Sequence, residues 1–514
     1  MPLLEYAAGL LACYYIVLSV YRVFFHPLSR IPGPLLAKIS DCYAGYFALG
    51  RSLHLRTHKD HGRYGSIMRY GPDRLVFNSA QAVHDIYQNP KITKSSVYTL
   101  TVVQGATMMF NTISPQLHSH RRKIIGPALS ERSIRFFEAT LIEQIDVFLR
   151  CISHAEKASV NLTDASKRLA MDVAGHLGFG FALHLQTKDD HRFILDGISL
   201  ANYRINAYMN FPFLSRLQLD RIFKLSPIRA KWRQLIEKMI TSRLAQGQDA
   251  IRDFYSFVVG NLDAGTNDLQ QSELFGESQF FMSAGGDTVS CTIAALFFYL
   301  SRYPSCYDQL AREIRTNFAS EDELRAGPKL SGCLYLRACI DEALRMSPPI
   351  AGTLWRQLAS DDGNEPLLID GLTVPQGTHV GVNTYAIQHS EEYFPDPFIF
   401  KPERWMDKPT PDLPARSAAP LAARQAFIPF SVGARSCAGK SLAYLESSLV
   451  LAKTLWSFDF EIPSGDVNTI GGGKQGLGDG RSRLYEFQLY DALTSRHDGP
   501  YLTFKPRVVS HAKR

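Results

Sequence analysis

A single cysteine stands in a glycine-rich turn directly before a long apolar segment that is expected to be a helix. The turn reads Phe430-Ser-Val-Gly433-Ala-Arg435-Ser-Cys437-Ala-Gly439. A cysteine here faces backbone N–H groups and a helix N-terminus, and both favour the thiolate form that binds metals. Gly433 and Gly439 let the backbone approach a large flat group, and Arg435 can pair with carboxylates beside it. The turn therefore predicts a thiolate ligand for haem iron.

The alternative for Cys437 is the ordinary fate of a free cysteine, a small buried apolar side chain. That interpretation suits the other cysteines, because none of them lies in a Cys-x-x-Cys pair or at zinc-ligand spacing from a histidine: Cys13, Cys42, Cys151, Cys291, Cys306, Cys333 and Cys339. Cysteines without a disulfide pattern also indicate a reducing compartment. For Cys437 the flanking glycines and arginine favour the metal ligand.

A second unusual segment, Ala284-Gly-Gly-Asp287-Thr288, lies inside an expected helix from Gly276 to Tyr303. Two glycines within a helix each cost about 1 kcal/mol relative to alanine, so a local need should offset them. One interpretation is a kinked core helix in which Asp287 is satisfied by a local partner. The other is a catalytic site, where the glycines open a notch and Asp287 and Thr288 transfer protons.

Both segments resemble motifs of the cytochrome P450 superfamily, the haem-thiolate monooxygenases. The cysteine turn matches every fixed position of Phe-x-x-Gly-x-Arg-x-Cys-x-Gly, and residues 284–288 match Ala/Gly-Gly-x-Asp/Glu-Thr. The resemblance implies that Cys437 is the axial ligand of haem b, with Phe430, Gly433, Arg435 and Gly439 around the cofactor. It implies that Asp287 and Thr288 deliver protons for oxygen activation. Val289 departs from the Thr or Ser common at the next position, which leaves the water network there undefined.

Further family motifs follow in order along the chain. Glu342 and Arg345 share one face of an amphipathic segment from Leu334 to Met346, and Arg404 follows in a Pro-Glu-Arg-Trp sequence. The resemblance implies that these three charges form a buried structural triad. It also suggests Arg356, Arg122 and His118 as partners of the haem propionates. His118 occupies a position that is usually tryptophan in the family, so the sequence departs from the family pattern there.

The 514 residues contain no long linker, repeat or charge block, which favours one large domain. The expected fold class is mainly α with small β-sheets (α+β), and the resemblance implies the cytochrome P450 fold. Residues 1–25 are expected to form a transmembrane anchor, 26–40 a proline-rich hinge, and 41–514 the catalytic haem domain. From Pro2 to Tyr21 the only charge is Glu5, over a length close to the ~20 residues that span a bilayer.

Basic residues follow the apolar segment, so the positive-inside rule places the body of the protein in the cytosol. The net charge of +7 is not gathered into a nucleic-acid-binding patch, so no nucleic-acid partner is expected. No flavin- or nicotinamide-binding segment is recognisable in the sequence. The resemblance therefore implies electrons from a separate NADPH-cytochrome P450 reductase, with both proteins at the endoplasmic reticulum membrane and a single-pass anchor here.

The expected reaction inserts one oxygen atom from O2 into an apolar small molecule, by hydroxylation or epoxidation. The sequence resembles those of fungal secondary-metabolism enzymes. Two alternatives are a haem-thiolate isomerase or dehydratase, disfavoured by Asp287 and Thr288, and a non-catalytic haem-binding protein. By family analogy the substrate pocket draws on four segments: Tyr98 to Phe110, Tyr203 to Phe213, Ile350 to Leu354, and Leu493 to Ser495. Such a pocket suits a medium-sized terpenoid, polyketide or indole-type compound, or an aromatic acid.

Overall fold

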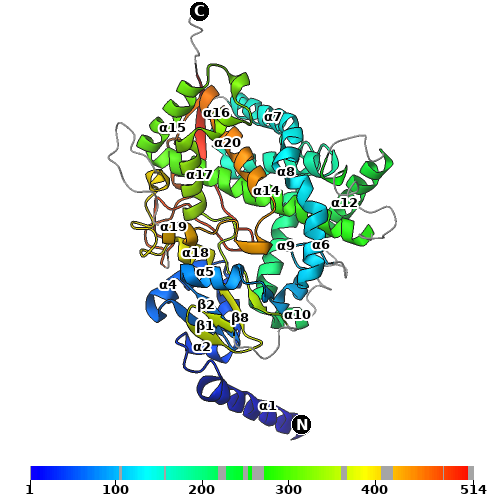
Figure 1. The fold of residues 1–514 in the computed structure, drawn as a ribbon, viewed down its shortest axis with the longest axis vertical. Coiled ribbons are helices and arrows are strands. Elements are labelled where there is room, and N and C mark those ends of the chain that lie inside the picture. The colour runs from blue at the N-terminus through cyan, green and yellow to red at the C-terminus, as the bar shows by residue number, and fades with distance from the viewer. Residues whose placement is uncertain are drawn as a thin grey trace, which may run out of the picture.

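The computed structural model of the chain describes residues 2–102, 107–155, 158–217, 227–246, 253–256, 271–359, 367–406, 421–478 and 480–507. Helices predominate within these residues, and the strands form small sheets, the largest of which lies at the end of the body near the N-terminal helix (Figure 1). The expected fold class, mainly α with small β-sheets, is therefore confirmed. All eight cysteines lie in the described part of the chain and are free thiols.

The body is built from long amphipathic helices packed around one central helix. The longer ones are α4 (Leu53–Tyr64), α6 (Pro115–Ile125), α7 (Glu131–His154), α8 (Leu162–Phe179), α9 (Phe193–Asn210), α12 (Pro227–Ala245), α14 (Gln271–Arg302), α15 (Pro304–Asn317), α17 (Leu334–Met346) and α20 (Lys440–Ser457). The shorter ones are α2 (Leu35–Ile39), α3 (Cys42–Leu49), α5 (Ala80–Tyr87), α10 (Phe213–Arg216), α16 (Pro328–Ser331), α18 (Thr384–Gln388) and α19 (Leu421–Ala426). Tight 3₁₀ turns include η2 (Ser96–Thr101), η3 (Gly126–Leu129), η4 (Glu321–Glu323), η5 (Pro402–Trp405), η6 (Gly433–Arg435) and η7 (Asp466–Thr469).

Helix α14 runs through the centre of the molecule and packs against α8, α17 and α20 (Figure 1). It begins earlier than the expected helix and ends one residue sooner, at Arg302, because Pro304 starts α15 with Tyr303 as its N-cap. Every residue from Val289 to Leu300 is buried. The longer stretch Phe280–Arg302, which contains these residues, is apolar enough to span a membrane, but it is mostly buried among the other helices and therefore belongs to the hydrophobic core.

The largest sheet has the order β1-β2-β8-β5-β3, formed by Ile67–Gly71, Arg74–Phe77, His379–Val382, Arg356–Leu358 and Ile92–Lys94. Strands β3 and β5 pair antiparallel, and their register sets Lys94 opposite Arg356. A second sheet joins β4 (Val160–Asn161), β10 (Tyr501–Pro506) and β9 (Phe458–Glu461), and β6 (Leu367–Ile369) pairs with β7 (Leu372–Val374). The register of β3 and β5 thus brings two basic side chains from distant parts of the chain together.

Helix α1 (Pro2–Val20) projects from the end of the body where α2 and β1 lie, and a π-helical turn, Tyr21–Phe25, continues it (Figure 1). The apolar stretch Leu3–Phe25 is long enough to cross a membrane, and none of it is buried in the protein. Beyond it, the carbonyl of Pro32 accepts a hydrogen bond from the N–H of Arg69 at 2.7 Å. A Cβ on Gly33 would lie 2.2 Å from the carbonyl oxygen of Arg69, so glycine allows this close seating on β1. The division into anchor, hinge and catalytic domain stays a prediction.

Candidate active site

A cavity of about 350 Å³ lies between α14 and the loop that carries Cys437. Ala284, Gly285 and Thr288 of α14 form part of its wall, and Cys437 forms part of the same enclosure. Most of the expected site residues line it: His118, Arg122, Thr288, Arg356, Phe430, Arg435, Cys437 and Gly439. Asp287 and Gly433 lie outside the wall. The fold therefore assembles around one cavity residues that are widely separated in the sequence.

The Cys437 loop is a tight backbone turn at the N-terminus of α20. The N–H of Cys437 donates to the carbonyl of Phe430 at 2.9 Å, and Gly439 is the N-cap of the helix. Cys437 is an exposed free thiol, and it lines the cavity. Burial raises the pKa of the Cys437 thiol, while the N–H groups of Gly439 and Lys440 and the charge of Arg122 act in the opposite direction. The expected N–H contacts are thus present, and their effect on the pKa of the thiol opposes the larger effect of burial.

Gly433 is required by the packing of the loop. Its backbone φ is +75°, and an added Cβ would lie 2.0 Å from the carbonyl oxygen of Tyr87 at the end of α5. Because a backbone carbonyl cannot move aside as a flexible side chain can, only glycine fits here. Glycine is thus required at position 433 by the contact with the Tyr87 carbonyl, whereas the sequence predicted a close approach of the backbone to a flat group. Gly439 does border the cavity, and no described atom lies within 4 Å of a Cβ placed on it.

Basic side chains gather on one wall of the cavity: Lys94, His118, Arg122, Arg356 and Arg435. Arg435 donates to the carbonyls of Thr112 and Ile113 at 2.6 and 2.8 Å, and Arg122 donates to the carbonyl of Ser436 at 2.9 Å. Arg356 is buried and donates to the carbonyl of Trp355 at 3.0 Å. These groups are held in place by neutral carbonyls, so their charges stay available to an anion in the cavity.

Mutual repulsion within this basic wall shows in the pKa values. Burial and then the charges of Arg435, Lys94, Arg122 and Arg356 lower the pKa of His118 to about 3. Burial and then Arg356 lower the pKa of Arg435 to about 10, and the pKa of Lys94 is lowered well below its usual value by burial, Arg356 and Arg435. The acids on the described part of the wall are Glu277 and Glu446. A ligand that carries carboxylates would relieve the repulsion on this wall.

Lys94 was not anticipated from the sequence. Its Nζ donates to the carbonyl of Phe110 and, at 3.4 Å, to that of Met109, and it lies 5.2 Å from the centre of the Tyr98 ring. Its local sequence is that of an ordinary short strand, and it is the pairing with Arg356 in the sheet that places it on the wall. Only a signal from pairwise contacts could have identified it.

On α14 the acid and the threonine face different surroundings. The hydroxyl of Thr288 lines the cavity and donates to the carbonyl of Ala284 at 2.6 Å. Asp287 is buried, and its Oδ2 accepts hydrogen bonds from Nδ2 of Asn202 at 2.9 Å and from Oγ1 of Thr494 at 3.0 Å. Burial raises the pKa of Asp287, and Lys167, Thr494 and Asn202 oppose that effect. The partners of Asp287 therefore come from distant segments and not from its own helix.

The two glycines before Asp287 have different surroundings. Gly285 borders the cavity, and a Cβ added to it would lie 3.7 Å from the Cβ of Ala174. A Cβ on Gly286 would lie 2.4 Å from the Cε of Met171, so glycine lets α14 pack closely on α8. The predicted notch thus applies to Gly285, whereas Gly286 serves helix packing.

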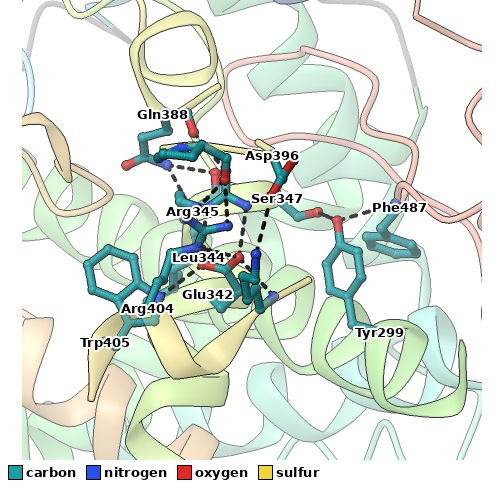
Figure 2. Close-up of polar contacts among 12 residues, drawn as sticks. Tyr299, Glu342, Leu344, Arg345, Ser347, Gln388, Asp396, Arg404, Trp405 and Phe487 are labelled. Atoms are coloured by element: carbon teal, nitrogen blue, oxygen red, sulfur yellow. Dashed lines mark hydrogen bonds and ion pairs between the residues drawn. The ribbon is translucent and has the colours of Figure 1, made fainter. Parts of the chain in front are cut away.

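The three charges expected as a structural triad are in direct contact behind the cavity (Figure 2). Arg345 Nε and Nη2 each donate to the carboxylate of Glu342 at 2.9 Å, and Arg404 Nε donates to it at 3.0 Å. Trp405 Nε1 adds a further bond at 2.9 Å. The attraction of Arg345 and Arg404 outweighs burial and lowers the pKa of Glu342. The triad joins α17 to η5 and, through a bond from Arg345 Nη1 to the carbonyl of Gln388, to α18.

The predicted pocket segments contribute unequally. The first supplies Tyr98, Thr101 and residues 108–110, and its residues 103–106 lie outside the described part. Ile350 and Leu354 line the cavity, as do Leu493 and Thr494. The segment from Tyr203 to Phe213 supplies only Ile205. The other residues of α9 that line the cavity precede this segment: Ile198, Ala201 and Asn202. The remaining lining is largely apolar and aromatic, including Phe280 and Phe281.

Comparisons with known proteins agree with this geometry. The family model described as "Cytochrome P450" matches residues 43–480. The cytochrome P450 monooxygenase AKT7 of Alternaria alternata is 35% identical over 97% of this chain and 96% of its own length. The cytochrome P450 monooxygenase apf7 of Gibberella fujikuroi is 34% identical over 96% of each chain. A solved structure, the cytochrome P450DA heme domain, superposes with a TM-score of 0.71 at 18% identity, covering 90% of this chain and 95% of that one, which supports the fold. The chain therefore belongs to the cytochrome P450 family and is a haem-thiolate monooxygenase.

Proposed function

We propose that Cys437 is the axial ligand of haem b and that the enzyme oxidises an apolar small molecule of fungal secondary metabolism. The single observation that carries the proposal is the cavity in which the Cys437 thiol and the Thr288 hydroxyl are both exposed. One wall of that cavity is basic and the rest is largely apolar. This combination suits a flat cofactor with carboxylate groups at one edge and an apolar substrate beside it.

The residues present fit haem. Cys437 offers a thiol that is open to the cavity, with the N–H groups of Gly439 and Lys440 facing the sulfur. Arg435, Arg356 and Arg122 would hold the propionates, because their charges meet no acidic partner at hydrogen-bonding distance within the described residues. His118 lines the same wall and would donate to a propionate once the anion offsets the cations that now keep it neutral.

Bound through the thiolate, the haem supplies the activation of O2 and the insertion of one of its atoms into the substrate. The protein's part is to deliver protons and to exclude water. Thr288 presents its hydroxyl at the cavity wall, and its proton is held between Oγ1 and the carbonyl of Ala284. Asp287, with its pKa raised by burial, holds a proton more readily than an exposed aspartate and can pass it toward Thr288.

The apolar character of the lining determines the expected substrate class. Phe110, Phe280 and Phe281 contribute aromatic surface, and Ile350 and Leu354 contribute aliphatic surface. Such a wall binds an apolar body through burial of its surface, at roughly 25 cal/mol per Å². Hydroxylation or epoxidation of a small apolar metabolite is the reaction that this lining supports.

The redox partner in this proposal is NADPH-cytochrome P450 reductase, and the setting is the endoplasmic reticulum membrane. Helix α1 supports the membrane part, since its apolar stretch is unburied and long enough for a single pass. Arg22 lies near the end of that stretch, and Arg30 and Lys38 follow it, which supports a cytosolic position for the catalytic domain.

The first test is the absorption spectrum of the reduced, carbon-monoxide-bound holoenzyme. We expect a strongly red-shifted Soret band that is lost in Cys437→Ser and kept in Cys42→Ser, an exposed free thiol remote from the cavity. NADPH oxidation in the presence of the reductase then tests turnover. A Cys437→Ser protein that keeps the red-shifted band would refute the assignment of the ligand.

A further inference from the structure

Lys94 is a buried cation on the wall of the cavity, at the end of strand β3. It is only 7% exposed, and the surface that it keeps belongs to the cavity lining. Its Nζ donates to the backbone carbonyls of Phe110 and Met109, the second at 3.4 Å. A lysine ammonium has three N–H donors, so one donor remains for a ligand in the cavity.

Lys94 forms no ion pair with a carboxylate in the described part of the chain. The acid that acts on its pKa is Glu277, and Arg121 lies 3.7 Å from that carboxylate. Burial and then Arg356 and Arg435 lower the pKa of Lys94 well below its usual value, against the weaker effect of Glu277. Lysines this deeply buried are ordinarily paired with an anion. Among the described residues, Lys94 has no such anion.

The cations of the wall outnumber the carboxylates of haem b, which are its two propionates. The cations are Lys94, Arg122, Arg356 and Arg435. The acids on the described part of the wall do not change this balance, because Arg121 offsets Glu277 and burial raises the pKa of Glu446 to about 8. Arg435 belongs to the turn that carries the thiol, and Arg122 donates to a carbonyl of that turn at 2.9 Å. With the propionates bound, the wall keeps positive charge for a further anion.

The contacts of Lys94 lie in the aromatic part of the lining. Its Nζ is 5.2 Å from the centre of the Tyr98 ring and 5.0 Å from that of the Phe110 ring. Phe110 stacks on Phe280 of α14, with 5.2 Å between the ring centres. Phe280 lies one helical turn before Ala284, and both line the cavity. An anion at Lys94 would therefore be attached to an apolar body that lies against α14.

The chemistry of lysine indicates which kind of anion fits. Its ammonium is a compact point charge that balances one negative charge, whereas a phosphate group is typically held by several donors, including the fork of an arginine. One remaining N–H and one charge at Lys94 suit a carboxylate. The surrounding rings exclude water, and a hydrogen bond between ions is stronger there than in solvent.

We propose that Lys94 binds the carboxylate of the substrate, so that the enzyme oxidises an apolar carboxylic acid. The inference rests on the proposed function, because it names the class of substrate for the same cavity. The substrate carboxylate accepts the remaining N–H of the ammonium and supplies the negative charge that the described residues do not. Its apolar body then lies along Phe110 and Phe280, so Lys94 fixes the orientation in which the substrate is oxidised.

The test is the binding of matched acids and amides to the ferric, haem-loaded protein at pH 7, followed by the shift of the Soret band. The probes are decanoate with decanamide and 4-phenylbutanoate with 4-phenylbutanamide, so each pair shares one apolar body and only the acid is charged. We expect the wild type to bind each acid roughly tenfold more tightly than its amide. Lys94→Met keeps an apolar stem and removes the charge. It should weaken binding of the acids roughly thirtyfold and change that of the amides by no more than about twofold.

The control variant is Lys91→Met, which removes an exposed lysine directly before β3 and should behave as the wild type. Transfer of haem to excess apomyoglobin gives a second readout that does not depend on substrate. Lys94→Met should lose haem at the wild-type rate, whereas Arg435→Met, which removes a proposed propionate partner, should lose it faster. Haem loss from Lys94→Met as fast as from Arg435→Met would assign Lys94 to a propionate and overturn the inference.

The outcomes separate the two proposals. A wild type without the red-shifted carbon monoxide band would overturn the proposed function itself. With that band present, acids that bind no more tightly than their amides, or a preference for acids that persists in Lys94→Met, would overturn the inference alone. The comparison in the wild type needs no variant, and Lys94→Gln takes the place of Lys94→Met if that protein does not fold.

Discussion

Replacing Glu342 with glutamine removes one negative charge from the centre of the buried triad while keeping the size of the side chain. In the native protein the carboxylate accepts bonds from Arg345, Arg404 and Trp405, all between 2.9 and 3.0 Å (Figure 2). The side chains of Glu342 and Arg345 are 0% exposed and that of Arg404 is 10% exposed. Glutamine would leave two guanidinium groups with no carboxylate and would direct N–H donors at them.

The cost follows from that burial. Removing one partner of a buried ion pair costs about 3–5 kcal/mol, because the remaining charge stays desolvated without compensation. We expect Glu342→Gln at the upper end of that range, since it strands two cations. Arg345→Gln should cost less, because Glu342 keeps Arg404. Arg404→Gln should cost the least, about 2 kcal/mol, because it removes one hydrogen bond to Glu342 and two longer ones to the carbonyl of Pro395 at a partly exposed side chain.

Chemical denaturation of the holoenzyme, followed by haem absorbance and by tryptophan fluorescence, measures these differences. The control is Glu237→Gln, which breaks an exposed ion pair with Arg233 and should cost about 0.3–0.5 kcal/mol. In a double-mutant cycle, Arg404→Gln should cost little once Glu342 is already glutamine, because the cation that it removes then has no partner. A Glu342→Gln protein within 1 kcal/mol of the wild type, or an additive cycle, would refute the reasoning.

Three further predictions concern the loop, a buried acid and a buried histidine. Gly433→Ala should abolish haem binding, because its Cβ would lie 2.0 Å from the carbonyl oxygen of Tyr87 at a φ of +75°. The haem content of the purified protein tests this prediction. The control is Gly126→Ala, whose Cβ meets no described atom within 4 Å and which should leave the haem content unchanged. Burial raises the pKa of Glu446 to about 8, so its contribution to stability is full below its unfolded pKa near 4.5 and is lost as pH rises through about 8. Glu446→Gln should therefore raise the unfolding free energy by an amount that grows from pH 5 to pH 8 and is about 3 kcal/mol at pH 7. Equal stability of the two proteins at pH 8 would contradict this. Burial lowers the pKa of His389 well below 6.5, so its contribution is present above that pH and lost as pH falls; His389→Phe should flatten the loss of thermal stability between pH 6.5 and 4.5, and an unchanged acid slope would contradict this.

The local motifs could be predicted because their chemistry lies within a few consecutive residues. The Cys437 turn, the acid–threonine pair on α14 and the Glu342–Arg345 pair each depend on spacing along one turn or one helix, and the structure places them as that spacing requires. The raised pKa of the Cys437 thiol could not be predicted in this way, because burial, which a sequence does not reveal, exceeds the effect of the N–H groups.

The family, the mainly helical class, the cysteine of the turn and the charges of the triad could all be inferred from the residues alone. The groups that complete the site are known only from the folded structure. Lys94 joins the basic wall because β3 pairs with β5, and Asn202 and Thr494 hold Asp287 because α9 and the segment around Thr494 meet at α14. Each of these contacts joins segments far apart in the chain. Hydrogen bonds and desolvation depend on distances of a few ångströms in space, and the positions of two residues along the sequence do not show whether they lie that close.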